Sequence, residues 1–316
     1  MKNFLTKTLL FLIPILLFFV GVEYTLRSLP NAFIIKSEYF KNNLGNINTL
    51  ILGTSHSQLA INPKYLKNKT ANISYSTQDI NTDATLFFHY IPKMKNLKTV
   101  VFEYSYHRLD LDNPPDYFRF PWYYMFYDVE IKPLKPQRKV SLYFSNPAFF
   151  SNILRGYFKK EPMPIINDYG FVEKNYFDEF GILNHDENII VKNTSKRLEH
   201  THKENEPEVF KKNALTLKKI ITYCEKNKIR LIFITTPLYK TYLESEIPEK
   251  KKKVDHLMAE LIKDYHVEYY DLSTSEDFKL TDYVDDNHLN AEGARKFSLI
   301  LDTLILKKNP VKNPEK

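Results

Sequence analysis

Two short stretches at opposite ends of the 316-residue chain hold the side chains best suited to chemistry. Near the start, the apolar run 50–52 ends at Gly53, and Ser55 follows it. Near the end, Asp285 and His288 form an Asp-x-x-His motif just ahead of a helical segment. A serine, a histidine and a carboxylate can supply a nucleophile, its base and the group that orients the base. The expected chemistry is acyl transfer through an ester on the serine.

Each of these residues also has an ordinary structural interpretation. Ser55 is suited to capping a helix, His288 to capping the final helix from the surface, and Asp285 to a turn. Two neighbours enter the same hypothesis. Asp286 is the alternative orienting carboxylate, and His56, next to Ser55, is expected to form part of the site wall as a substrate-binding candidate.

The elements around the two stretches predict an α/β fold that brings them together. From residue 46 to 307, short apolar runs alternate with segments of helical period, which is typical of a mostly parallel sheet covered on both faces. The expected strands are 50–52, 99–102, 230–235 and 267–270, and the expected helices are 81–95, 209–226, 250–265 and 291–306. Ligand sites in such sheets lie at the carboxyl ends of the strands. We therefore expect Ser55 and His288 to meet at one edge of the sheet.

The two motifs resemble those of the SGNH (GDSL-like) hydrolase superfamily, which opens with a strand and Gly-Asp-Ser and closes with Asp-x-x-His. Gly53-Thr54-Ser55 resembles the first block, with Thr54 in place of aspartate, and Asp285 and His288 match the last. The closest likeness is to the membrane-anchored branch that accompanies polysaccharide O-acetylation and teichoic-acid D-alanylation. The resemblance implies a three-layer sandwich and a cofactor-free esterase or O-acyltransferase with a Ser-His-Asp triad. Its implied substrate is an acylated cell-envelope polysaccharide, and its implied partner is a membrane-bound acyltransferase.

The superfamily's two middle blocks, which supply a glycine N–H and an asparagine side chain to the oxyanion hole, have no counterpart here. The second block falls at 71–78, which has no glycine, and the third follows 100–102, where there is no asparagine. The remaining donor candidates are Ser55, Ser76, Thr77, Tyr106, His107 and Arg108. Losing one donor typically costs on the order of 100- to 1,000-fold in rate. The alternative function is therefore a non-catalytic assembly or glycan-binding protein that keeps the fold.

The N-terminus predicts a membrane anchor. Lys2 and Lys7 precede the uncharged run 8–22, which contains Pro14. A membrane span needs about 20 apolar residues, and flanking residues extend this run. No small-x-small cleavage site follows it, so we expect an uncleaved signal-anchor over 1–27, with a cleaved signal peptide as the alternative. The lysines place the N-terminus in the cytoplasm, and the remainder is expected outside a cell membrane that the chain crosses once.

Behind the anchor, the sequence predicts a linker over 28–47, an SGNH-like domain over 48–307 and a flexible tail over 308–316. Residues 110–205 fit neither helical nor strand period for long and are expected to form an insertion. Within it, 140–159 is expected to hold one or two helices broken at a proline.

The start of the insertion, 110–128, is rich in proline and aromatic residues. Its Trp122 and Tyr123 are substrate-binding candidates, because exposed aromatic rings can stack on sugars. The alternative is that these rings pack against residues 140–160.

Composition argues against several other classes of protein. The formal net charge is +7, but the lysines are spread along the chain rather than grouped with aromatic residues, so no nucleic-acid partner is expected. Cys224 is the only cysteine, which rules out an intrachain disulfide, and we expect it to be buried on a helix. The 9 histidines form no metal-binding spacing, so no metal site is expected.

Overall fold

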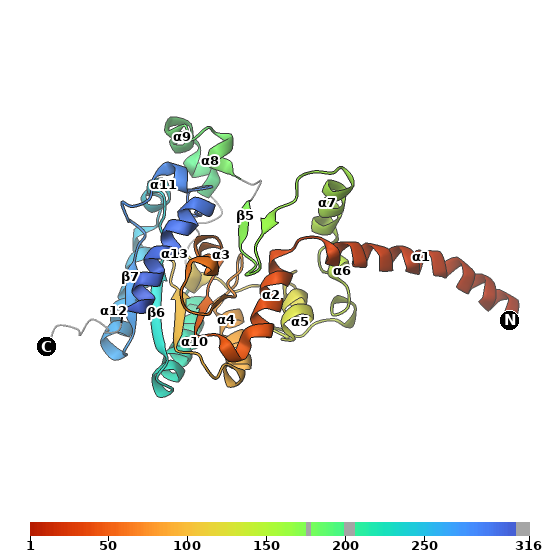
Figure 1. Ribbon diagram of the computed structural model, residues 1–316, viewed down its shortest axis with the longest axis horizontal. Coiled ribbons are helices and arrows are strands. Elements are labelled where there is room, and N and C mark those ends of the chain that lie inside the picture. The colour runs from red at the N-terminus through yellow and green to blue at the C-terminus, as the bar shows by residue number, and fades with distance from the viewer. Residues whose placement is uncertain (175–177, 199–205, 308–316) are drawn as a thin grey trace. The chain divides into compact units, whose positions relative to one another are not determined.

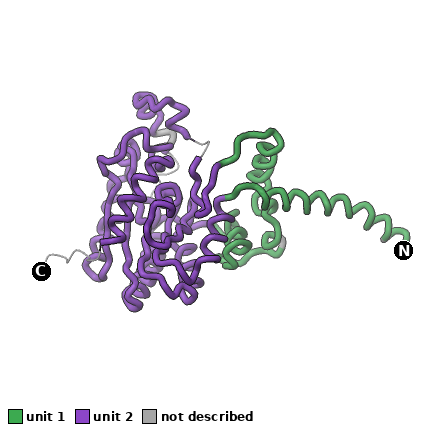
Figure 2. Tube along the Cα trace, in the orientation of Figure 1, with its two compact units in different colours: residues 1–31, 114–164 green, residues 32–113, 165–316 purple. Residues whose placement is uncertain are grey.

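The computed structural model describes residues 1–174, 178–198 and 206–307. It contains two compact units, shown in Figure 2. One is made of residues 1–31 and 114–164, and the other of residues 32–113 and 165–316. The predicted tail, 308–316, lies outside the described residues.

A five-stranded parallel sheet organises the larger unit (Figure 1). Its strand order is β2 (Thr70–Asn72), β1 (Thr49–Leu52), β3 (Thr99–Glu103), β6 (Arg230–Thr235) and β7 (Glu268–Asp271). Every neighbouring pair in this sheet is parallel. The expected α/β class with a mostly parallel sheet is therefore confirmed.

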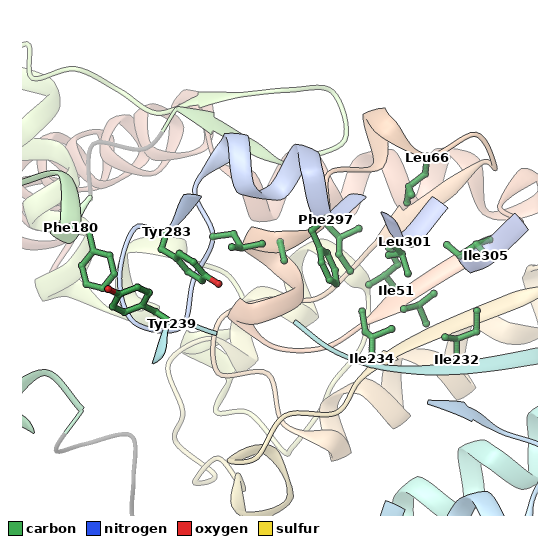
Figure 3. Packing of buried hydrophobic residues seen from close by; sticks show 14 of the residues in the cluster. Ile51, Leu66, Phe180, Ile232, Ile234, Tyr239, Tyr283, Phe297, Leu301 and Ile305 are labelled. Carbon is green, nitrogen blue, oxygen red and sulfur yellow. The ribbon is translucent and has the colours of Figure 1, made fainter. Parts of the chain in front are cut away.

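Helices cover both faces of this sheet, because its strand residues are apolar on both sides. Figure 3 shows Ile51, Ile232 and Ile234 on the face covered by helix α13 (Ala291–Leu306), which contributes Phe297 and Leu301. Side chains alternate along a strand, so the fully buried neighbours of these isoleucines point to the opposite face. Helices α4 (Ile80–Tyr90) and α10 (Pro207–Lys226) pack together there. Cys224 is buried in α10, as predicted.

Most of the elements expected from periodicity are present. The four expected strands correspond to β1, β3, β6 and β7, and the expected helices to α4, α10, α12 (Pro248–Asp264) and α13. Strand β2 was not expected, because it is only three residues long and carries no apolar pattern. The remaining elements of this unit are α3 (Ser55–Ala60), the antiparallel pair β4 (Ile165–Ile166) and β5 (Val172–Lys174), α8 (Glu179–Ile182), α9 (Glu187–Leu198), α11 (Lys240–Glu244) and the 3-10 turns η1 (Leu44–Asn46), η2 (Pro63–Tyr65), η3 (Ile91–Lys93), η4 (Arg108–Asp110) and η6 (Leu280–Asp282).

The expectation of a linker over 28–47 is wrong, because helix α2 (Ala32–Asn43) occupies most of it. Its buried face includes Phe33, Lys36 and Phe40. The Lys36 ammonium donates to the Ser74 carbonyl over 2.8 Å, and burial lowers the pKa of Lys36 to about 7. A lysine on the inward face breaks the apolar period by which a helix is recognised.

The smaller unit combines the N-terminal helix α1 (Lys2–Ser28) with α5 (Phe120–Tyr127), α6 (Leu142–Ser145), α7 (Pro147–Phe158) and the turn η5 (Pro136–Arg138). Within α1, Thr6–Ser28 is long and apolar enough to cross a membrane, although a signal sequence would pass the same test. The expected helix break at Pro147 is confirmed, since α7 begins there. The expected boundary of the insertion differs, because 114–164 groups with α1 rather than with the sheet.

The predicted exposure of Trp122 and Tyr123 is wrong. Their side chains are 2% and 1% exposed, respectively. The Trp122 Nε1 donates to Ser145 Oγ over 2.8 Å, and its ring packs 5.6 Å from that of Phe150. These rings form the core of the smaller unit, as the packing alternative predicted, and cannot offer a flat surface to a sugar.

Candidate active site

Ser55 is the first residue of α3, directly beyond the carboxyl end of β1. The register pairs Leu52 with Phe102, which brings the loop before Ser55 alongside Glu103 at the end of β3. The buried Glu103 carboxylate accepts from the Thr54 N–H and from the Thr54 hydroxyl, each over 2.6 Å. Contacts between the ends of β1 and β3 thus hold in place the residues that lead to Ser55.

Gly53 is required by this close approach. A Cβ built on Gly53 would lie 2.8 Å from Glu103 Cβ and 2.8 Å from Ser57 Oγ. Any side chain there would push β1 and β3 apart or displace the turn that carries the serine. The glycine of this motif, one of only 7 in the chain, therefore reflects a packing constraint.

The Asp-x-x-His motif forms a closed turn before α13. Asp285 Oδ1 accepts from the backbone N–H of Asn287 over 3.0 Å and of His288 over 2.8 Å. The Val284 N–H donates to the His288 carbonyl over 3.0 Å, which closes the loop. Asn290 then caps α13 through its side chain. Backbone N–H groups of the turn thus orient the Asp285 carboxylate independently of its contact with the His288 ring.

The structure brings Ser55, His288 and Asp285 into one hydrogen-bonded chain. His288 Nδ1 lies 2.9 Å from Asp285 Oδ2, and His288 Nε2 lies 2.8 Å from Ser55 Oγ. The contacts expected from motif spacing are therefore present at the expected distances. With Nδ1 held by a carboxylate, Nε2 is the nitrogen free to accept the serine proton.

The charges in this chain shift both pKa values in the direction that favours the ion pair. Burial opposes the charged forms, but the His288 ring and two backbone N–H groups lower the pKa of Asp285 below its usual range. Burial likewise opposes protonation of the ring, yet the Asp285 charge and hydrogen bond, with a contribution from Glu103, raise the pKa of His288 above 6.5. His288 is thereby made a stronger base than a free histidine.

A cavity of about 500 Å³ opens over the serine and histidine. Its walls come from α3, the β4–β5 hairpin, the Asp-x-x-His turn and the start of α13. Its lining residues are Ser55, Gln58, Leu59, Ser76, Phe171, Val172, Glu173, Lys174, Asp178, Val284, Asp285, His288, Leu289, Asn290, Ala291 and Glu292. Cavities of roughly 300–1,000 Å³ are typical of small-molecule sites.

Two predicted neighbours lie elsewhere. His56 does not line this cavity: it is 1% exposed, and its ring packs edge-on behind that of His288 at 5.3 Å. Burial lowers the pKa of His56 to about 3, so the ring is neutral and accepts from the Asn287 amide over 3.2 Å. Asp286 is buried and accepts from the Thr241 hydroxyl instead of from His288.

Only two of the donor candidates, Ser55 and Ser76, line the cavity. The Ser76 N–H already donates to Gln58 Oε1 over 2.7 Å. Ser55 opens α3, so its N–H is one of those that a helix leaves without an internal acceptor.

The other candidates make contacts elsewhere. Thr77 adopts a left-handed backbone with φ of 55°, and its carbonyl accepts from the Asn113 amide. The Tyr106 hydroxyl accepts from the Ile247 N–H, the His107 ring packs 4.8 Å from His56, and Arg108 pairs with the buried Asp83. Thr77 lies in the loop after β2, whereas Tyr106, His107 and Arg108 lie in the loop after β3. None of these four residues lines the cavity.

Sequence reasoning missed the parts played by Glu103, Gln58 and Asn287. Glu103 was recognisable as a carboxylate that directly follows the apolar run 100–102. Gln58 was recognisable by spacing, because residues i and i+3 share a helix face and it follows Ser55 by three. The Asn287 contact with His56 joins residues 231 apart in sequence and had no local signal.

Comparison with known proteins gives a distant likeness. No family model and no curated protein matches the sequence. Three solved structures each share 10% identity. A protein assigned to the G-D-S-L lipolytic family from Desulfitobacterium hafniense has a TM-score of 0.40 over 82% of this chain and 99% of its own. One assigned as an acylhydrolase from Bacteroides fragilis has 0.39 over 84% and 94%. One assigned as a platelet activating factor from Streptococcus pneumoniae has 0.43 over 94% and 98%.

Proposed function

We propose that this chain is a membrane-anchored serine esterase or O-acyltransferase that acts outside the cytoplasm on acyl groups of cell-envelope polysaccharide. The observation that carries the proposal is the Ser55–His288–Asp285 chain of hydrogen bonds, whose three residues line a cavity. The anchor rests on the apolar span within α1. The polysaccharide substrate and a membrane-bound acyltransferase partner rest on the motif resemblance alone.

The reaction begins when Ser55 Oγ attacks the carbonyl carbon of an acyl ester and passes its proton to His288 Nε2. Asp285 stabilises the imidazolium that forms, through the contact at Nδ1. The tetrahedral intermediate then collapses, the alkoxide leaving group takes the proton from His288, and the acyl group remains on Ser55. Water or a sugar hydroxyl next attacks this acyl-serine, with His288 again accepting and returning the proton.

The negative oxygen of the intermediate needs donors, and two groups in the cavity wall are suited to this role. The first is the Ser55 N–H at the start of α3. The second is the side-chain amide of Gln58: its oxygen accepts from Ser76, so its NH2 is the donor that remains. Ser55 and Gln58 share one face of α3 and both line the cavity. Gln58 is thus our candidate replacement for the asparagine of the resembled family.

The alternative function is a non-catalytic assembly or glycan-binding protein. It is favoured by the Ser76 N–H, which lies at the second-block position and is already satisfied by Gln58. If no donor pair serves the intermediate, the cavity would hold an acylated glycan without cleaving it.

A fluorophosphonate probe applied to the detergent-solubilised full chain tests the proposal. We expect covalent labelling of Ser55, found by peptide mass, that disappears in Ser55→Ala and falls sharply in His288→Ala. Ser76→Ala is the matched control, because it removes a cavity hydroxyl and keeps the backbone N–H; it should label normally. A folded wild-type chain that never labels, yet binds acylated glycan, would establish the alternative.

A further inference from the structure

The smaller unit carries an exposed aromatic surface beside the apolar helix α1. We define this surface by four residues, Phe144, Phe149, Tyr157 and Phe158, which are 48%, 41%, 43% and 74% exposed, respectively. Phe149 and Tyr157 are eight residues apart on α7, so they lie along one side of that helix. Large rings are rarely left in water without a reason when they gather in one patch.

The aromatic surface is fixed to α1 at a defined level. The Glu23 carboxylate accepts from the Leu142 N–H over 2.8 Å, the Tyr143 N–H over 3.2 Å and the Ser141 hydroxyl over 2.9 Å. The Phe144 ring packs 5.5 Å from that of Phe19. Helix α6 is thereby held against the last turns of α1, as Figure 1 shows.

That level coincides with the end of the apolar run of α1. Residues 8–22 carry no charge, and Glu23 is the first charge after them. Phe19 lies four residues before Glu23, which is about 6 Å along a helix. If Glu23, the first charge after the uncharged run, marks the edge of the apolar layer, Phe19 and its partner Phe144 lie just inside that edge. Aromatic rings are favoured at this depth, where the bilayer changes from apolar to polar.

Charge is consistent with the same placement. The segment 114–164 contains eight Lys and Arg residues against four Asp and Glu residues. Arg155, Lys159 and Lys160 are exposed on or directly after α7. On α7 itself, Phe149 and Tyr157 lie on one side and Arg155 on the other. Exposed aromatic residues next to cations are typical of segments that lie in a membrane interface and favour anionic lipids.

We propose that the aromatic surface of α6 and α7 lies in the outer interface of the same bilayer that α1 crosses, in contact with anionic phospholipid. The inference rests on the membrane anchor of the proposed function. It adds a second point of attachment, because the smaller unit would contact the membrane through α6 and α7 as well as crossing it through α1.

Spin labels on single cysteines test this in a Cys224→Ala background, with the full chain in vesicles of phosphatidylcholine and phosphatidylglycerol. Labels at Phe149 and Tyr157 should show a ratio of oxygen to nickel-complex accessibility several-fold above that of a label at Arg155, on the other side of α7. Leu299, exposed on α13, is the aqueous control. Lys159→Glu combined with Lys160→Glu should make the two aromatic positions shallower.

A label at Leu12, in the middle of α1, separates this inference from the anchor itself. Labels at Phe149 and Tyr157 that match Leu299 while Leu12 reads as hydrocarbon would overturn the inference and leave the anchor intact. A water-exposed Leu12 would overturn the anchor, and the second attachment with it.

Discussion

The base at the centre of the site is His288, whose pKa is raised chiefly by the Asp285 carboxylate. His288 must be neutral to accept the Ser55 proton, so activity should appear as pH rises through the pKa of His288, which lies above 6.5. Replacing Asp285 with Asn removes the negative charge that raises this pKa. We expect the acidic limb of the kcat/KM profile to move to lower pH and the maximal rate to fall on the order of 10⁴-fold.

The pH profile of ester hydrolysis, measured for wild type and Asp285→Asn, checks this prediction. Asp286→Asn is the matched control, since that neighbouring carboxylate contacts Thr241 and not the ring. Its limb should stay where the wild-type limb is. Identical limbs in all three proteins would mean that Asp285 does not set the basicity of His288.

Gln58 makes two contributions that a pair of variants can separate. Gln58→Leu removes both its oxygen and its NH2, and we expect kcat to fall about 100- to 1,000-fold, as for loss of one oxyanion donor. Gln58→Glu keeps the oxygen that accepts from Ser76 but replaces the donor with a negative charge. Steady-state kinetics should show at least as large a loss in Gln58→Glu. Near-normal kcat in that variant would reduce Gln58 to a support for the Ser76 loop.

At the scale of elements, the contact between β1 and β3 positions the nucleophile. Gly53→Ala places a methyl group against Glu103 and Ser57, and we expect it to lower the free energy of unfolding by about 1–3 kcal/mol, as overpacking does. Gly45→Ala is the control, because nothing lies within 4 Å of its added methyl. It should change stability by less than about 0.5 kcal/mol. Urea denaturation followed by circular dichroism compares them, and equal effects would contradict a packing role for Gly53.

Elements with a regular apolar pattern were predictable from the sequence, and so was the proximity of the catalytic residues at the carboxyl edge of the sheet. Strands β1, β3 and β6 and helix α13 are continuous apolar patterns, and the rule that sites lie at strand ends placed Ser55 beside His288. Helix α2 was hidden because it buries Lys36, whose ammonium group donates to the carbonyl of Ser74, a residue distant in sequence. The contacts behind the catalytic residues could not be predicted for the same reason. They join residues that are distant in sequence, such as His56 and Asn287, and so produce no local pattern in the sequence.

At the scale of the whole molecule, the chain forms its two units from interleaved segments. Residues 114–164 belong to the smaller unit together with α1, whereas the segments on either side of them, 32–113 and 165–316, belong to the sheet-bearing unit (Figure 2). Sequence patterns place this segment inside the larger domain, because its tie to α1 runs through Glu23, more than a hundred residues away. The single-domain expectation over 48–307 therefore differs from the compact units of the structure.

Each unit contains one buried residue whose exposure can be followed separately during unfolding: Trp122 in the smaller unit and Cys224 in the larger one. Trp122 is the only tryptophan, and it lies in the core of the smaller unit, while the only thiol, Cys224, is buried in α10 of the larger one. Tryptophan fluorescence during denaturation therefore follows one unit, and the reaction of a coloured thiol reagent follows the other. Transfer from detergent to lipid vesicles should raise the denaturant midpoint of the fluorescence change and leave that of thiol exposure where it was. Midpoints that shift together would mean that the two units unfold as one cooperative body.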